Sequence, residues 1–264
     1  MITSAQNKLI KEVKALARKR ERTKTGLFVA EGLRFVKSAI DVNAEIEYIL
    51  YSESIYRTDE GSQLVKNLES THKKVMEIDE KLMIELSDTQ SPQGIIALVK
   101  QPKYTWENIL KKNGFIIILD RLQDPGNLGT IIRTADAAGA DGMILTKGSV
   151  DVYNPKVLRS TMGSIFELPV LEGLVWDEIE TVLTENNYNL YATALEDSVD
   201  YDAPDYKQAS ALIIGNEANG ISSQILDAVK TKVKIPIVGS AESLNAGVAA
   251  AVMMYEVLRQ RRNK

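Results

Sequence analysis

The sequence predicts an α/β protein of two domains, with a parallel sheet in the second half. Three observations support this class. The 264 residues are about twice the length of an average domain. Short apolar runs alternate with segments of helical period along the chain. In the second half these runs are apolar on both faces, as in parallel strands covered by helices on each side.

The composition excludes several classes of protein. With 44% hydrophobic and 26% charged residues, the chain has the makeup of a soluble globular protein. It has no uninterrupted apolar run of about 18 residues and no signal peptide, which predicts no membrane partner and a cytoplasmic location. The absence of cysteine excludes disulfides, thiolate metal sites and cysteine nucleophiles. The single histidine, His72, sits in a polar, loop-like stretch, so we expect no metal site.

Basic residues gather at the start of the chain. The net charge is −4, but the first 24 residues hold eight basic and two acidic side chains, a charge of +6, which leaves −10 for the other 240 residues. A helix predicted over 4–19 carries an apolar stripe opposite its lysines. This basic face either binds nucleic-acid phosphates or is solvated, and charge alone favours neither. The candidate nucleic-acid contacts are Lys8, Lys11, Lys14, Arg18, Arg20 and Arg22.

The first half has the pattern of a small α/β domain, in which four apolar runs are separated by helical segments. A proline and a change of polarity at 101–106 end the pattern. We therefore place the boundary near residue 105, which gives domains 1–105 and 106–264. The predicted strands are 27–30, 46–50, 74–78 and 95–99, and the predicted helices are 33–40, 62–69 and 79–86.

The second half repeats the alternation with stronger apolar runs. Three of its strands end in polar loops that contain the candidate functional residues. The predicted strands are 115–119, 142–145, 190–193, 211–214 and 233–237.

The first polar loop follows the strand at 115–119. Its segment 124–127 has the sequence of a turn, and Asn127 is well placed to cap the helix that runs to residue 138. Arg133 lies near the start of this helix of Ile, Ala and Gly, where a guanidinium is unusual unless it pairs or binds an anion; the alternative is a solvated helix position. The loop lacks the glycine motifs of dinucleotide and P-loop sites.

The second and third polar loops follow the strands at 211–214 and 233–237. Glu217 lies between Gly215 and Gly220, which let the backbone turn tightly near a ligand, although a surface acid in such a turn is the commoner case. In the third loop, Ser243 and Asn245 precede a helix of small residues, where they either cap that helix or belong to a site. The small side chains predict a closely packed, buried helix.

Together the three loops resemble the motifs of the SpoU (TrmH-type) branch of the SPOUT RNA methyltransferases, which transfer a methyl group from S-adenosylmethionine to a ribose 2′-hydroxyl. The resemblance covers 115–262 and rests on the segments 124–129 with Arg133, 215–220, and 235–236 with 243–245. It implies a deep trefoil knot, S-adenosylmethionine as cofactor, and a homodimer through the knotted domains. The apolar helix positions suited to that interface are Met253, Met254 and Leu258.

The resemblance also implies roles for the site residues. Asn127 and Arg133 hold or activate the hydroxyl and the neighbouring phosphate, Glu217 orients the arginine or the ribose, and Ser243 and Asn245 shape the site. The family assigns the arginine as general base, but a guanidinium stays protonated under ordinary conditions, so phosphate anchoring is equally physical. The implied cofactor-binding residues are Thr193, Gly215, Gly220, Ile235 and Leu244.

The first half is similar to the substrate-binding domain of this family, an α/β unit resembling small ribosomal RNA-binding proteins, through the stretches 4–7, 28–32 and 92–95. This implies that the basic helix contacts RNA, ribosomal (23S) RNA in preference to transfer RNA. Two alternatives are methylation of transfer RNA and a catalytically silent RNA-binding or ribosome-assembly protein. The intact polar site residues argue against the silent protein. A Rossmann-type methyltransferase or oxidoreductase would need a glycine fingerprint that the chain lacks.

Overall fold

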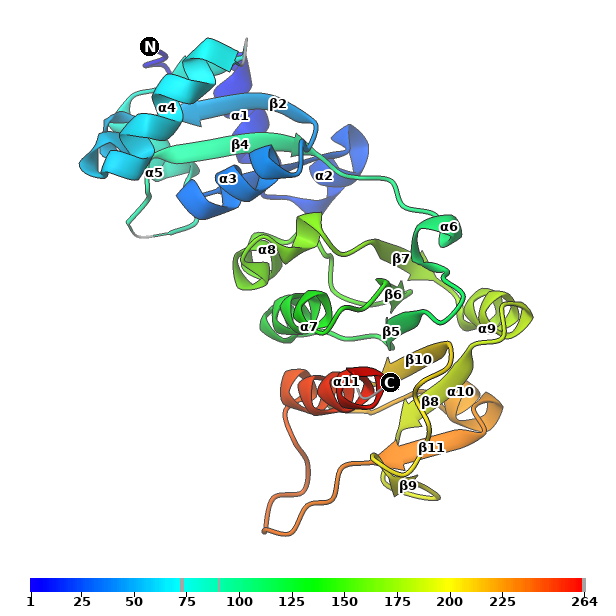
Figure 1. The fold of residues 1–264 in the computed structure, drawn as a ribbon. Coiled ribbons are helices and arrows are strands. Elements are labelled where there is room, and N and C mark those ends of the chain that lie inside the picture. The colour runs from blue at the N-terminus through cyan, green and yellow to red at the C-terminus, as the bar shows by residue number, and fades with distance from the viewer. Residues whose placement is uncertain (72–73, 90, 263–264) are drawn as a thin grey trace. The chain divides into compact units, whose positions relative to one another are not determined.

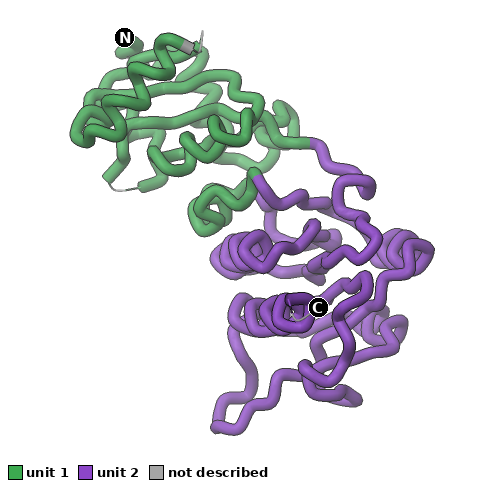
Figure 2. Tube along the Cα trace, viewed as in Figure 1, with its two compact units in different colours: residues 1–102, 153–166 green, residues 103–152, 167–264 purple. Residues whose placement is uncertain are grey.

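The computed structural model describes residues 1–71, 74–89 and 91–262, and its chain forms two compact units, shown as a ribbon in Figure 1 and by colour in Figure 2. Unit 1 comprises Met1–Pro102 and Tyr153–Phe166, and unit 2 comprises Lys103–Val152 and Glu167–Lys264. The predicted α/β class is confirmed in both units. The interpretation of His72 as a loop residue falls outside the described residues.

Unit 1 is built on a four-stranded mixed sheet in the order β1-β4-β2-β3. The central strand β4 is antiparallel to β1 and β2, and β3 lies parallel to β2. All but the last residue of β4 are buried, because helices cover the sheet. The strands are β1 (Leu27–Glu31), β2 (Ile46–Tyr51), β3 (Val75–Glu77) and β4 (Ile95–Lys100), and the helices are α1 (Lys8–Ala15), α2 (Lys19–Thr25), α3 (Leu33–Asp41), η1 (Glu53–Arg57), α4 (Asp59–Thr71) and α5 (Glu80–Leu86).

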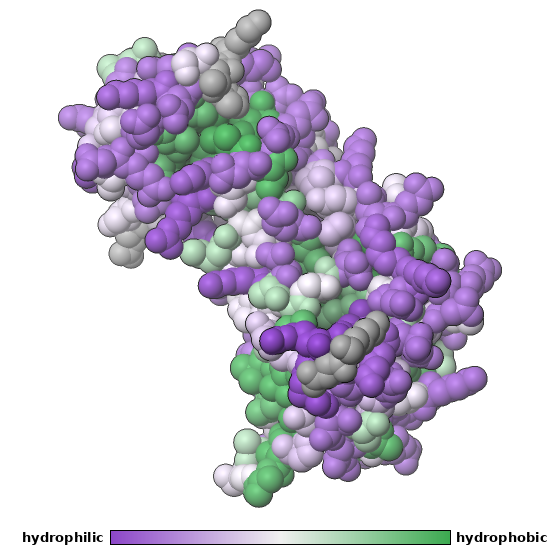
Figure 3. Space-filling model, viewed as in Figure 1, coloured by the Kyte–Doolittle hydropathy of each residue, from purple (hydrophilic) through white to green (hydrophobic). Residues whose placement is uncertain are grey.

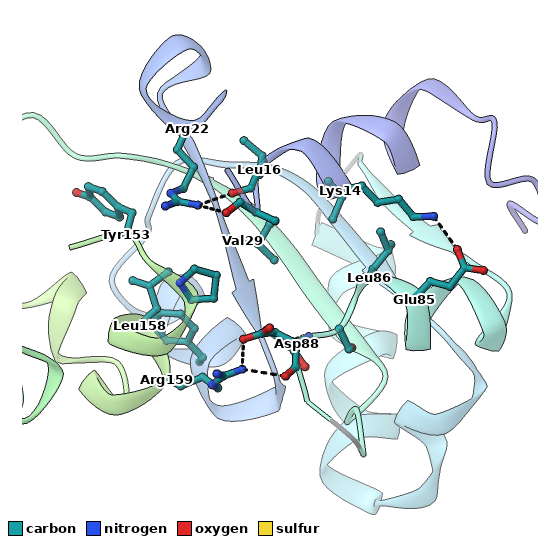
Figure 4. Close-up of a pocket in the computed structure, with 16 residues that line it drawn as sticks. Lys14, Leu16, Arg22, Val29, Glu85, Leu86, Asp88, Tyr153, Leu158 and Arg159 are labelled. Atoms are coloured by element: carbon teal, nitrogen blue, oxygen red, sulfur yellow. Dashed lines mark hydrogen bonds and ion pairs between the residues drawn. The ribbon is translucent and has the colours of Figure 1, made fainter. Parts of the chain in front are cut away.

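The helix predicted over 4–19 is shorter in the structure, where α1 spans Lys8–Ala15, and a second helix, α2, follows at Lys19–Thr25, mostly beyond the predicted range. The first starts where it does because the side chain of Asn7 accepts a hydrogen bond from the N–H of Leu9 at 2.9 Å. Beyond its end, Nη1 of Arg22 donates to the carbonyl oxygens of Leu16 and Ala17 at 2.7 and 2.9 Å (Figure 4). Arg22 is 4% exposed, so its prediction as a surface RNA contact is wrong, and it stabilises the turn between the two helices.

A segment of the second half of the sequence packs into unit 1 and contains α8 (Pro155–Thr161) and η2 (Ser164–Phe166). The ring of Tyr153 lies 4.9 Å from that of Phe28, centroid to centroid. On α8, Arg159 donates to the carbonyl oxygen of Asp88 at 3.1 Å and forms an ion pair with its carboxylate (Figure 4). Local sequence patterns report none of these contacts, because they join residues far apart in the chain.

Unit 2 contains a seven-stranded sheet in the order β7-β6-β5-β10-β8-β11-β9. Every neighbouring pair is parallel, which confirms the sheet predicted from the doubly apolar runs. The strands are β5 (Phe115–Leu119), β6 (Gly142–Thr146), β7 (Val170–Leu174), β8 (Asn189–Thr193), β9 (Val199–Asp200), β10 (Ser210–Ile214) and β11 (Thr231–Lys234).

Helices cover both faces of this sheet, with α7 (Pro125–Ala137) and α11 (Ala246–Arg262) on one face and α9 (Trp176–Glu185) and α10 (Ser223–Ala228) on the other (Figure 1). A short helix, α6 (Trp106–Ile109), precedes β5. Because side chains alternate across a strand, Ile116 and Ile118 of β5 join the core under α9 and α10. No helix in the described part of the chain is long and apolar enough to cross a membrane.

Unit 2 departs from the sequence prediction at its sheet edges. The strand predicted over 233–237 is β11, which ends at Lys234, because Pro236 has no N–H to pair and the chain leaves the sheet there. The strands β7 and β9 were not predicted. The apolar run of β7 is interrupted by the charged Glu172 and by Gly173, and β9 is only two residues long. Short or mixed edge strands lack the apolar run that identifies a central strand.

We expect Arg22→Ala to destabilise unit 1 by about 2 kcal/mol, because it removes a buried charged donor from two carbonyl oxygens. The measurement is native-state hydrogen exchange of the amides of β1 and β4. Arg20→Ala removes an exposed arginine from the same helix and should change this free energy by less than about 0.5 kcal/mol. Equal loss of protection in the two variants would contradict the role assigned to Arg22.

Candidate active site

The candidate site lies at the carboxyl edge of the unit 2 sheet. Because β5, β10, β8 and β11 are successive parallel neighbours, the chain leaves all four strands at the same edge. The loops after β5, β10 and β11 are the three polar loops identified in the sequence. They are hereafter the first loop (120–124), the second loop (215–222) and the third loop (235–245).

The cap of α7 is Asp124, and the prediction that Asn127 fills this position is wrong. The side chain of Asp124 accepts a hydrogen bond from the N–H of Asn127 at 2.7 Å, and Pro125 takes the first helical position, which suits its fixed φ. Asn127 therefore lies within the first turn of the helix. Its side-chain amide does not cap the helix and extends toward the other two loops.

One chain of hydrogen bonds joins the three loops. Oε1 of Glu217 accepts from Nδ2 of Asn127 at 3.0 Å, and Oδ1 of Asn127 accepts from Nδ2 of Asn245 at 2.9 Å. Glu217 also accepts from the backbone N–H groups of Gln123 at 3.1 Å and Asp124 at 3.0 Å. Side chains separated by 90 and 118 positions in the sequence thus meet at one place. We call Glu217, Asn127 and Asn245 the polar chain.

The surroundings of Glu217 favour its ionised form. Partial burial raises the pKa of the carboxyl group, but the hydrogen bonds from Asn127 and from the backbone of Gln123 and Asp124 outweigh it, so the pKa lies below the ordinary value of 4.5. Both oxygens accept N–H groups at the start of α7, where the helix dipole also favours a negative charge. Glu217 therefore acts as an anchor between the first and second loops.

Asn245 connects the third loop to α11. Its Oδ1 accepts from the N–H groups of Gly247 at 2.9 Å and Val248 at 3.3 Å, so the predicted capping of this helix is confirmed. Its Nδ2 remains for Asn127. At Gly247, an added Cβ would lie only 3.2 Å from Oδ1 of Asn245, so a small residue lets the cap pack closely. Ser243 lies on an exposed part of the same loop.

A cavity of about 580 Å³ opens beside the polar chain. Its walls combine apolar side chains with backbone groups, as is usual in small-molecule sites. Thr193, at the end of β8, donates its hydroxyl to the carbonyl oxygen of Ile213 at 3.1 Å, so this hydroxyl already has a partner within the protein. The sequence-predicted site residues that line the cavity are Thr193, Gly215, Glu217, Gly220, Ile235, Ser243, Leu244 and Asn245.

The wall formed by the second loop depends on Gly215. An added Cβ at this position would lie 2.3 Å from the carbonyl carbon of Gly220 and 2.4 Å from the nitrogen of Ile221, both backbone atoms. The two arms of the loop are closed by backbone hydrogen bonds in both directions between Asn216 and Gly220, at 3.0 and 2.9 Å. A residue with a side chain at Gly215 would force these arms apart.

The third loop extends away from the sheet between β11 and α11 (Figure 1) and carries exposed apolar side chains. Val238 is 99% exposed and Leu244 is 38% exposed. Figure 3 shows apolar surface at this protruding end of the unit. Ile237 and Leu244 also line the cavity, so the loop forms one of its sides.

Arg133 stands apart from the polar chain. It is exposed on α7, and within the described ranges of the chain its guanidinium has no hydrogen-bond acceptor. Glu217 orients Asn127 in this structure, and its contacts do not include Arg133. A cation without a protein partner remains available to an anion.

Five of the six predicted RNA contacts are exposed basic side chains of unit 1. Lys8, Lys11 and Lys14 lie exposed on α1, while Arg18 and Arg20 are exposed at the start of α2. Lys14 forms an ion pair with Glu85 at 2.6 Å, which is weak in solvent and can open to another partner. The sixth residue, Arg22, is buried as described above.

The outward face of α11 differs from the sequence prediction. Met253 and Met254 are fully buried within unit 2, so they are not available to an interface between copies of the chain. The exposed apolar residues of this helix are Val248 and Tyr255, each 50% exposed. The prediction of a buried helix therefore holds for one face only.

Several residues of the site were missed in the sequence. Asp120 is 2% exposed and lies directly after β5; Gln123, Asp124 and Asn216 organise the first and second loops. One signal was available. An acid that directly follows five apolar residues at the end of a predicted parallel strand lies where such sheets place their ligand sites.

The fold and the site define a class of protein, an α/β domain with a ligand cavity and a polar cluster at the carboxyl edge of a parallel sheet. Within this class, the chain belongs to the SpoU rRNA Methylase family, whose model matches residues 114–255. Residues 7–97 match the MRM3-like substrate binding domain. The resemblance drawn from the three loops is confirmed.

Similar proteins of known name match nearly the whole chain. A 23S rRNA (guanosine(2553)-2′-O)-methyltransferase RlmP of Bacillus subtilis is 34% identical over 97% of this chain and 98% of its own length. A 23S rRNA (uridine(2479)-2′-O)-methyltransferase of Streptomyces viridochromogenes is 33% identical over 93% of this chain and 87% of its own. The crystal structure of an AdoMet-bound rRNA methyltransferase from Sinorhizobium meliloti has a TM-score of 0.87 at 33% identity, covering 98% of this chain and 97% of that one.

We expect Glu217→Gln to lower the free energy of unfolding near neutral pH. This loss should become smaller as the pH falls. Because the folded pKa of Glu217 lies below 4.5, its carboxylate stabilises the fold above about pH 4.5, and this contribution is lost as the pH drops through the folded pKa. The measurement is the free energy of unfolding of both proteins from pH 7 to pH 3. Glu185→Gln, at an exposed position on α9, serves as the control. A constant difference between wild type and Glu217→Gln across this range would contradict the assignment.

Proposed function

We propose that this protein transfers a methyl group from S-adenosylmethionine to a ribose 2′-hydroxyl of 23S ribosomal RNA. The observation that carries the proposal is the polar chain, which ties Asn127 and Asn245 to Glu217 beside a cavity large enough for a nucleoside cofactor. Methyl transfer to a hydroxyl requires the hydroxyl to be held in line with the donor. The 23S rRNA 2′-O-methyltransferases of similar sequence support the substrate class.

The cavity residues fit S-adenosylmethionine. An adenine ring needs apolar walls and backbone partners, which Ile235, Leu244 and the tight turn of Gly215 provide. Thr193 and Gly220 complete the lining beside them. The bound cofactor supplies a methyl group already activated by its sulfonium, so the protein must mainly align the acceptor and exclude competing geometries.

Asn127 is the residue placed to orient the ribose. Each atom of its amide has one protein partner, which fixes the plane of the amide, and each retains one further hydrogen-bonding position. The amide can thus accept from or donate to a hydroxyl without losing Glu217 or Asn245. Ser243 lines the cavity next to Asn245 and shapes its rim.

Arg133 is assigned to the RNA backbone. Its exposed guanidinium carries a permanent charge and has donors directed to solvent, which suits a phosphate. Action as a general base would require it to lose a proton from a group with a very high ordinary pKa. Phosphate anchoring therefore agrees better with its surroundings.

The remaining RNA contacts are assigned to unit 1. The candidate contacts are the exposed basic side chains of α1 and of the start of α2, namely Lys8, Lys11, Lys14, Arg18 and Arg20. The match of residues 7–97 to a substrate-binding domain supports RNA binding by this part of the chain. We divide the function accordingly, with RNA recognition in 1–105 and methyl transfer in 106–264.

Three further features are part of the proposal because the family resemblance implies them. The methyltransferase domain contains a deep trefoil knot, the protein works as a homodimer through this domain, and it acts in the cytoplasm on ribosomal RNA. The exposed Val248 and Tyr255 of α11 are the apolar positions available for the dimer.

The function is tested by incubating the protein with an unmodified 23S rRNA transcript and methyl-labelled S-adenosylmethionine. We expect the label in an alkali-resistant dinucleotide, because a 2′-O-methyl group removes the hydroxyl that attacks the adjacent phosphodiester. Asn127→Ala should lower the rate by about 100-fold, since it removes the group that orients the acceptor. Unfractionated transfer RNA is the parallel substrate.

Each other outcome identifies an alternative. Label only on transfer RNA would show that the substrate is transfer RNA and not 23S rRNA. Tight binding of 23S rRNA without any label would identify a catalytically silent RNA-binding protein. Either result overturns the proposed function.

We expect Gly215→Ala to weaken binding of S-adenosylmethionine tenfold or more, because the new Cβ meets the backbone of Gly220 and Ile221 and overpacking of this kind costs about 1–3 kcal/mol. Isothermal titration calorimetry measures the affinity. Gly239→Ala is the matched control, since a Cβ at that position of the third loop has no neighbour within 4 Å. Unchanged affinity in Gly215→Ala would show that the cofactor does not rest on the second loop.

A further inference from the structure

Arg121, the second residue after β5, adopts an unusual backbone conformation. Its φ is 52°, in the left-handed region that favours glycine and asparagine. For a long side chain this conformation costs about 1 kcal/mol. The backbone of Arg121 is held there by two bonds: its N–H donates to Oγ1 of Thr146 at 2.9 Å, and its carbonyl oxygen accepts from Nδ2 of Asn216 at 2.8 Å.

A buried carboxylate holds the side chain of Arg121. Asp120 is 2% exposed and accepts from Nε of Arg121 at 3.2 Å and from its Nη2 at 3.1 Å. Asp120 accepts in addition from Oγ1 of Thr146 at 3.1 Å and from the N–H of Ser222 at 2.8 Å. Burial raises the pKa of Asp120, but these hydrogen bonds outweigh it and the carboxyl group stays ionised at neutral pH.

Only one edge of the guanidinium is used in this way. The bonds to Asp120 engage Nε and Nη2, and Nη1 has no acceptor among the residues that the structure describes. The side chain of Arg121 is 40% exposed. A guanidinium fixed along one edge and open to solvent along the other has little conformational freedom to lose when it binds an anion.

The open edge belongs to the same end of the sheet as the polar chain. The carbonyl oxygen of Arg121 is bonded to Asn216, one residue before Glu217. Two residues after Arg121, Gln123 donates its N–H to Glu217 and its side-chain amide to the carbonyl oxygen of Gly148 at 2.5 Å. Arg121 is thus fixed between the loops that follow β5 and β6, next to the loop that carries Glu217.

We propose that Arg121 binds a phosphate of the RNA strand that enters the active site. This inference rests on the proposed function, which requires a polyanionic strand to lie along the carboxyl edge. A buried ion pair alone would explain the charge of Arg121, because Asp120 needs a cation. It would not explain why a residue with a strained backbone, in a loop of the site, leaves the second edge of its guanidinium exposed to solvent.

The salt dependence of RNA binding tests this inference. Each phosphate contact adds about 0.7 to 0.9 to the slope of log K against log salt concentration. Arg121→Gly relieves the backbone strain and removes the contact, so we expect about tenfold weaker binding of an unmodified 23S rRNA transcript and a slope reduced by nearly one. Arg121→Lys keeps a charge and should keep the slope while losing affinity. Lys230→Gln removes an exposed lysine just before β11, at the opposite edge of the sheet, and should leave methyl transfer unchanged.

The other outcomes are distinct. An Arg121→Gly protein that binds S-adenosylmethionine normally and retains the wild-type slope overturns the inference. If this variant loses cofactor binding or thermal stability, Asp120→Asn/Arg121→Asn is compared with Asp120→Asn instead, because a neutral amide at position 120 needs no cation and asparagine at position 121 also tolerates the left-handed region, and the same criterion applies. Wild-type protein that fails to bind 23S rRNA overturns the proposed function and, with it, this inference.

Discussion

The arrangement of the site depends on the side-chain amide of Asn127, which has a partner on each side. The parallel sheet brings the first and second loops together, since β5 and β10 are neighbours. The third loop starts from β11, three strands away from β5 and hence about 14 Å distant. Packing of α11 against α7 returns the chain to the site, and the bond between Asn245 and Asn127 fixes that return. Sheet order alone would leave the third loop remote.

Most of the fold was predictable from the sequence, because central strands are continuous apolar runs and their helices have a clear period. The loops were also predictable as loops. Their convergence was predicted only through the family resemblance, since no local pattern shows that the late strand β10 pairs with the first strand of unit 2. The identity of the α7 cap was missed for a related reason: Asp124 and Asn127 both suit a cap, and only the position of Pro125 decides between them. The transfer of residues 153–166 to unit 1 rests on contacts that no local pattern records.

Three arginines of this chain have different physical roles. Arg22 is buried and donates to carbonyl oxygens, Arg121 forms an ion pair with a buried carboxylate, and Arg133 is exposed on a helix. A guanidinium on a long apolar stem can satisfy any of these environments, so the sequence does not distinguish them. The acidic net charge of the chain is equally uninformative about RNA binding, because the contacting face determines the attraction and the total charge does not.

If the protein works as proposed, the polar chain also limits which group can remove the hydroxyl proton. Glu217 commits both oxygens to N–H groups and its pKa is lowered, so it is a weak base in a geometry that opposes protonation. The amides of Asn127 and Asn245 cannot accept a proton at neutral pH, and a guanidinium gives one up only in an extreme environment. A sulfonium donor, however, needs little help from a strong base. Under the proposed function, orientation would supply about 7–11 kcal/mol of the barrier, and Asn127, which is held by a hydrogen bond on each side, is suited to provide it.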